Sequence, residues 1–171
     1  NSLNGFNNLN EFILCEIINA TRVMVEKIEV IRDIPKENRY NDLLLAILRL
    51  RIVVWGWNIA DQARAGKSAN DKDAGEVDHL ITASGNTIAL FEAFILRDKN
   101  YTEKHILKCQ MYVNHLDRYY IIIYYRDKYE DFEHEWKKYQ QDVLNIDYPL
   151  DLKIKEGIEF TDISNNLERT I

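Results

Sequence analysis

A glutamate inside an otherwise apolar strand is the feature that most limits how this chain can fold. The segment ALFEAFIL places Glu92 among residues typical of a buried strand. A buried carboxylate is costly unless it is paired, binds a metal or becomes neutral. The fold must therefore bring a partner to Glu92. An ion pair with a lysine from a neighbouring helix is one possibility, and a shared metal ion is another.

A predicted β-hairpin supplies a candidate second carboxylate. Residues 76–83 and 87–96 have the alternation and β-branching of strands, and a short turn is centred on Gly85. In this register Asp78 lies directly opposite Glu92. Like charges opposed in this way destabilise a sheet, whereas a divalent cation takes carboxylate and carbonyl oxygens as ligands. The hairpin thus predicts a metal site, although Asp78 has an alternative role as a strand-end residue bonded to a turn amide.

The remaining elements predict an α/β sandwich around a mixed sheet. Apolar positions at helical spacing and breakers such as Pro35 and Gly56 mark the helices. The run YYIIIYY is typical of a buried central strand. We predict helices over 9–34, 37–55, 103–116 (with Thr102 as its cap) and 129–143, and further strands over 57–62, 119–125 and 158–163.

Length and charge favour one compact domain. In the 171 residues we expect an N-terminal helical segment (1–35), an α/β core (36–148) and a C-terminal extension (149–171), within a longer protein because the chain opens on Asn. A net charge of −6 argues against coating nucleic acid by bulk charge but allows a local basic groove. The two cysteines lack metal-site spacing and suggest a reducing cytoplasm. No apolar run reaches the roughly 18–20 residues of a membrane span, so no membrane partner is expected.

The αβββαβ order, the Gly-Glu-x-Asp element ending at Asp78 and the acidic third strand resemble the PD-(D/E)xK, restriction-endonuclease-like nuclease superfamily. The resemblance covers roughly residues 36–126. It implies a restriction-endonuclease-like core with an added N-terminal helix, in which Asp78, Glu92 and the carbonyl of Ala93 hold Mg²⁺ or Mn²⁺. Glu37 lies where the family places a helical acid. A glutamate in a first helical turn is also favoured by the helix dipole alone.

One position departs from the family pattern. Phe94 stands where the ExK motif has its lysine, and a phenyl ring can neither activate water nor stabilise negative charge. In some members of the superfamily another element supplies the lysine. Lys104 and Lys108, one turn apart in the predicted helix 103–116, are the candidates here, although both are also ordinary positions for solvated lysines. His105, in the same helix, is a further target for mutation.

The resemblance therefore implies a cytoplasmic, metal-dependent nuclease of the kind found in prokaryotic defence. Its partners would be DNA, other domains of a longer chain and a second copy in a homodimer. The alternative is a catalytically inactive nuclease-like module for interaction or nucleic-acid sensing, which Phe94 favours. Four basic residues are the candidates for holding the DNA backbone: Arg39, Arg64, Lys67 and Lys72.

Overall fold

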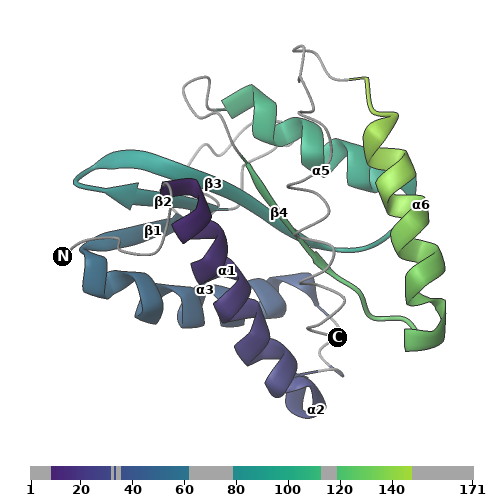
Figure 1. Ribbon diagram of the computed structural model, residues 1–171, viewed down its shortest axis with the longest axis horizontal. Helices are drawn as coiled ribbons and strands as arrows, with labels where there is room; N and C mark the ends of the chain where they lie inside the picture. The colour runs from purple at the N-terminus through teal and green to yellow at the C-terminus, as the bar shows by residue number, and fades with distance from the viewer. Residues whose placement is uncertain (1–8, 32, 34–35, 62–78, 113–118, 148–171) are drawn as a thin grey trace.

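The computed structural model describes residues 9–31, 33, 36–61, 79–112 and 119–147 (Figure 1). The described chain is mixed α/β, as predicted, and from α3 to β4 it follows the predicted order of helix, three strands, helix and strand. The elements are α1 (Leu9–Glu26), α2 (Ile28–Ile31), α3 (Glu37–Ile52), the 3₁₀ turn η1 (Val53–Trp55), β1 (Trp57–Asp61), β2 (His79–Ala83), β3 (Asn86–Ile95), α5 (Lys99–Tyr112), β4 (Tyr120–Tyr124), η2 (Tyr129–Asp131) and α6 (Phe132–Leu144).

The four described strands form one mixed sheet in the order β1-β2-β3-β4. β1 and β2 pair antiparallel, as do β2 and β3, whereas β3 and β4 are parallel. The parallel pair requires a crossover connection, which contains α5. Among the described strands β4 lies at the edge of the sheet, whereas the sequence predicts a central strand; the predicted strand 158–163 lies outside the described residues. Its apolar sequence is explained instead by helices on both faces, because Ile122 packs on the α1 and α3 side and Ile123 on the α6 side.

The predicted hairpin between β2 and β3 is confirmed. Its two turn residues, Ser84 and Gly85, have φ values of 50° and 80°, the left-handed conformation that tight hairpin turns require. The register shifts by one residue between Ile81 and Thr82, and beyond this irregularity His79 pairs with Phe91. This is the register that the predicted pairing of Asp78 with Glu92 requires. Asp78 itself lies outside the described residues.

Helices cover both faces of the sheet: α1 and α3 lie on one face, and α5 and α6 lie on the other (Figure 1). The side chains of β3 alternate between the two faces, as a strand requires. Phe91 and Ala93 pack in the cluster with α1 and α3, whereas Leu90 packs against Cys109 of α5. Glu92, between Phe91 and Ala93, therefore points toward α5.

The predicted N-terminal helix packs into the same core as the sheet. Ile13 and Ile17 of α1 join Leu44 and Leu48 of α3 in the cluster that covers β3. The helical run is shorter than predicted, since α1 ends at Glu26 and the four-residue α2 follows it. No helix in the part of the chain that the structure describes is long and apolar enough to span a membrane.

The start of α5 differs from the prediction. The helix begins at Lys99, so Thr102 lies within it and is buried rather than capping it. The cap is Asp98, whose Oδ1 accepts a hydrogen bond from the backbone N–H of Tyr101 at 3.0 Å. A carboxylate at this position satisfies a donor that the first helical turn leaves open. The effect is an additional turn at the end of α5 nearest β3, and Tyr101 lies on that turn.

Candidate functional site

Glu92 is the charged residue at the centre of the sheet face that α5 covers. It has no exposed surface, and its neighbours along β3, Phe91 and Ala93, are equally buried. On the adjacent parallel strand its partner in register is Ile121. The strand therefore offers this carboxylate an apolar environment, and its charge must be compensated by side chains from another element.

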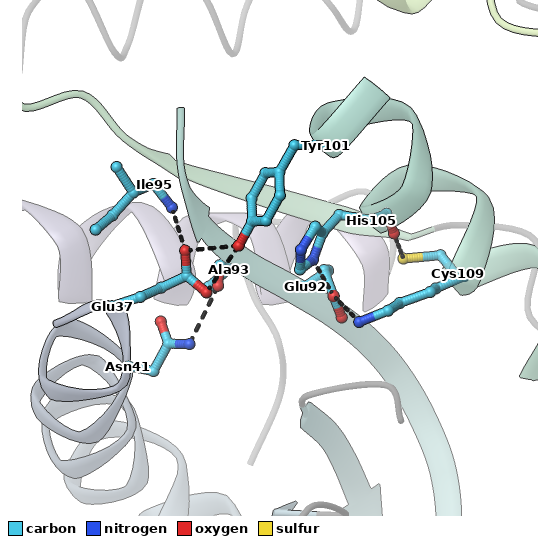
Figure 2. A network of polar contacts seen from close by, with 9 residues as sticks. Glu37, Asn41, Glu92, Ala93, Ile95, Tyr101, His105 and Cys109 are labelled. Carbon is cyan, nitrogen blue, oxygen red and sulfur yellow. Dashed lines mark hydrogen bonds and ion pairs between the residues drawn. The ribbon is translucent and has the colours of Figure 1, made fainter. Parts of the chain in front are cut away.

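Two side chains of α5 meet this carboxylate. The Nδ1 atom of His105 lies 2.6 Å from Glu92 Oε1 (Figure 2), and the Nζ atom of Lys108 lies 3.2 Å from the same oxygen. Both groups are largely shielded from water, since their side chains are 10% and 17% exposed. Lys108 is the more exposed of the two and is the member of the cluster that extends toward solvent. The arrangement is a buried carboxylate with two nitrogen partners on one oxygen.

An aromatic wall holds the imidazole in this position. The ring of Phe94 lies 4.8 Å from that of His105 at an interplanar angle of 31°, and the ring of Tyr101 lies 4.4 Å from it at 45°. Phe94 has no exposed surface. Because Phe94 follows Glu92 by two residues on one strand, both side chains are on the same sheet face. The phenyl ring at the motif-lysine position thus packs against the histidine that contacts Glu92.

A second polar network joins α3 to the end of β3 and to α5 (Figure 2). Glu37 Oε2 accepts a hydrogen bond from the backbone N–H of Ile95 at 2.8 Å and another from the hydroxyl of Tyr101 at 3.1 Å. One turn further along α3, Asn41 Nδ2 donates to the carbonyl of Ala93 at 3.1 Å. Glu37 therefore fastens three elements together, and the contacts of its carboxylate are with Ile95 and Tyr101 rather than with Glu92.

The oxygen atoms near Ala93 bear on the predicted metal site. The carbonyl of Ala93 already accepts a hydrogen bond from Asn41, whose own Oδ1 is buried and has no hydrogen-bond partner among the described residues. Carboxylate, amide and carbonyl oxygens are ligands that Mg²⁺ takes. No group of three or more His, Cys, Asp or Glu side chains able to hold a metal occurs among the described residues. These residues fit one side of such a site, with Glu92 as its carboxylate.

The structure separates the two predicted lysines. Lys108 reaches Glu92, whereas Lys104 is exposed and lines an open surface pocket on the outer side of α5 with Asn100, Glu103 and Leu107. Arg39 is exposed on the first turns of α3. The other predicted site residues lie outside the described residues: Asp78, Arg64, Lys67 and Lys72.

His105 is the partner of Glu92 to which the sequence prediction assigned no role. A signal for it is present, since His105 and Lys108 are three residues apart and share one face of a helix. Nearby, burial raises the pKa of the Tyr119 hydroxyl, and the charge of Cys109 raises it further. Tyr119 therefore remains protonated at neutral pH and provides no base to this face of the sheet.

No protein-family model, curated protein or solved structure matches the chain. The functional interpretation therefore rests on the arrangement of Glu92, His105 and Lys108 and on the order of the elements that hold them.

Proposed function

We propose that this protein is a metal-dependent nuclease that hydrolyses phosphodiester bonds in DNA. The observation that carries the proposal is the 3.2 Å contact between the ammonium group of Lys108 and the carboxylate of Glu92. The resemblance to PD-(D/E)xK nucleases requires a lysine beside the third-strand acid, and the strand itself supplies only Phe94. Lys108 meets this requirement from α5. The helix–three-strand–helix–strand order and the mixed sheet further support the restriction-endonuclease-like core.

In this proposal Glu92 and Asp78 hold Mg²⁺ or Mn²⁺, with the carbonyl of Ala93 as a backbone ligand. When bound, the ion polarises the scissile phosphate and lowers the pKa of a water molecule. Lys108 stabilises the negative charge that develops on the phosphate, in a site where burial strengthens electrostatic interactions. Glu37 has a structural role in addition to any catalytic one, because it fixes the end of β3 against α3 and α5.

The residues that bind the phosphate backbone of the DNA in this proposal are Arg39, Arg64, Lys67 and Lys72. Their positive charges locally offset the net negative charge of the chain. A cytoplasmic location and a defence role within a longer, dimeric protein complete the proposal by family resemblance. The two cysteines, Cys15 and Cys109, are not joined in a disulfide, which is consistent with a reducing compartment.

A second function is favoured by a different observation. Glu92 and Phe94 are both fully buried, and the contacts of Glu92 with Lys108 and His105 are also those of an ion pair that stabilises a core. In that case the protein is an inactive nuclease-like module that binds a partner or nucleic acid without cleaving it. Metal affinity distinguishes the two functions, because an ion pair with only a structural role needs no metal ion.

The test is a calorimetric titration of Mn²⁺ and Mg²⁺ into the wild type and the variants Asp78→Asn and Glu92→Gln. Glu133→Gln serves as the control, since Glu133 is exposed on α6 and its carboxylate pairs with Lys137. We expect binding in the wild type and in the control and its loss in both site variants. Absence of binding in a folded wild type, or equal binding in Asp78→Asn, contradicts the nuclease and favours the inactive module.

A further inference from the structure

We propose that His105 is a positioning residue for Glu92 and that Phe94 replaces the motif lysine in order to hold the imidazole there. The proposal rests on the nuclease function insofar as Glu92 is a metal ligand. Its geometric part concerns three side chains alone. The imidazole of His105 contacts both the phenyl ring of Phe94 and the carboxylate of Glu92, so the three side chains form one cluster on this face of the sheet.

The first step concerns the proton between His105 and Glu92. The two atoms, Nδ1 and Oε1, are 2.6 Å apart and buried, which is a hydrogen-bond distance. An ionised carboxylate only accepts hydrogen bonds, and the Nζ atom of Lys108 lies 3.2 Å from the same oxygen. In this proposal Nδ1 carries the proton and donates it to Oε1. The bond fixes the tautomer and the ring orientation of His105 as well as the position of Oε1.

The second step concerns Phe94. The ring packs against the imidazole at 4.8 Å, and Tyr101 packs against it at 4.4 Å, so His105 contacts aromatic groups from both β3 and α5. A lysine at position 94 would place an ammonium group on the same sheet face, beside a ring that needs an apolar contact to stay in place. Phe94 therefore occupies the position of the motif lysine, while Lys108 of α5 supplies the positive charge. Phe94 is in this view a supporting part of the site.

The consequence is that two residues of α5 together replace the motif lysine. Lys108 provides the permanent charge, and His105 provides a directed hydrogen bond that holds the carboxylate still. Groups that orient a metal-binding carboxylate in this way typically contribute about 10–100-fold to metal affinity or activity. Loss of His105 should therefore weaken the site without removing its charge.

The experiment compares two substitutions of His105. His105→Asn keeps an N–H donor close to the position of Nδ1, whereas His105→Leu removes the donor and keeps most of the volume. We expect Mn²⁺ affinity, measured by calorimetry, to fall about 10–100-fold in His105→Leu and to stay within about threefold of wild type in His105→Asn. Circular dichroism establishes that both variants are folded. Equal affinity in His105→Leu and wild type, or equal loss in both variants, overturns the proposal.

Nitrogen-15 NMR of the imidazole separates this inference from the nuclease function. The chain has four histidines, and the His105 signal is assigned by its absence in His105→Asn. We expect a protonated Nδ1 in the wild type and a changed protonation pattern in Glu92→Leu and in Phe94→Ala, with Phe94→Leu as the apolar control that retains it. If the wild type binds no metal, the nuclease proposal fails while this spectrum still decides the positioning role. An unprotonated Nδ1, or a spectrum unchanged in Glu92→Leu, overturns that role.

Discussion

The partners of the Glu92 carboxylate follow it closely in the sequence: His105 is 13 residues away and Lys108 is 16. Such short separations arise because β3 runs directly into α5 and the helix folds back on the strand. The need for a partner was evident from the apolar sequence around Glu92, and Lys108 was among the predicted partners. The choice between Lys104 and Lys108 was not predictable, because it depends on which side of α5 faces the sheet.

Glu37 was predicted as an acid of the site, and its contacts lead to a prediction about stability. In Glu37→Ala the backbone N–H of Ile95 loses the acceptor that it has at 2.8 Å, and Tyr101 loses one at 3.1 Å. Removing the partner of a buried donor costs about 1–3 kcal/mol, and since both donors here are part-buried, about 1 kcal/mol is expected. We therefore expect urea denaturation to show a free energy of unfolding lower by this amount in Glu37→Ala. Glu37→Gln, which keeps a side-chain acceptor, should lose less. Equal losses in the two variants would show that these hydrogen bonds do not stabilise the fold.

Among the elements, α5 carries two residues that contact the Glu92 carboxylate, His105 and Lys108, and the orientation of the helix determines which of its side chains reach that carboxylate. One side of α5 carries Tyr101, His105 and Lys108, which are spaced by one helical turn. The two rings and the ammonium group therefore lie on the side of the helix that faces β3. Lys104 lies further round the helix toward solvent. The sequence predicts this element correctly as a helix, but the helix begins at Lys99 rather than Glu103, because Asp98 rather than Thr102 is the cap. The competing signal was Asp98, three residues before the N–H that it accepts.

This reassigned cap leads to a prediction for the start of α5. Asp98→Ala removes the side-chain acceptor for the Tyr101 N–H and should lower the free energy of unfolding by about 1 kcal/mol, within the usual range for a cap. Asp98→Asn keeps an acceptor and should stay close to wild type. Chemical denaturation measures both, and hydrogen exchange at Tyr101 should quicken in Asp98→Ala alone. A cap at Thr102 would instead leave Asp98→Ala unchanged.

For the whole molecule, the order of helices and strands predicted the mixed sheet, and the turn at Gly85 predicted its central hairpin. The position of β4 could not be predicted from its own sequence. A run of apolar residues indicates that both faces are covered, and it does not distinguish a central strand from an edge strand under helices. Two networks then tie the layers together. One joins β3 to α5 through Glu92, and the other joins α3, β3 and α5 through Glu37.

In the proposed nuclease Lys108 supplies the positive charge that Phe94 cannot, and the cleavage rates of three proteins test this role. The measurement is the rate of DNA cleavage in Mn²⁺ by the wild type, by Lys108→Met and by Lys104→Met, the last being an exposed lysine on the same helix. We predict cleavage by the wild type, a loss of about 100-fold or more in Lys108→Met, and a rate for Lys104→Met within about threefold of wild type. No cleavage by a folded wild type, or equal losses in the two lysine variants, would contradict the claim.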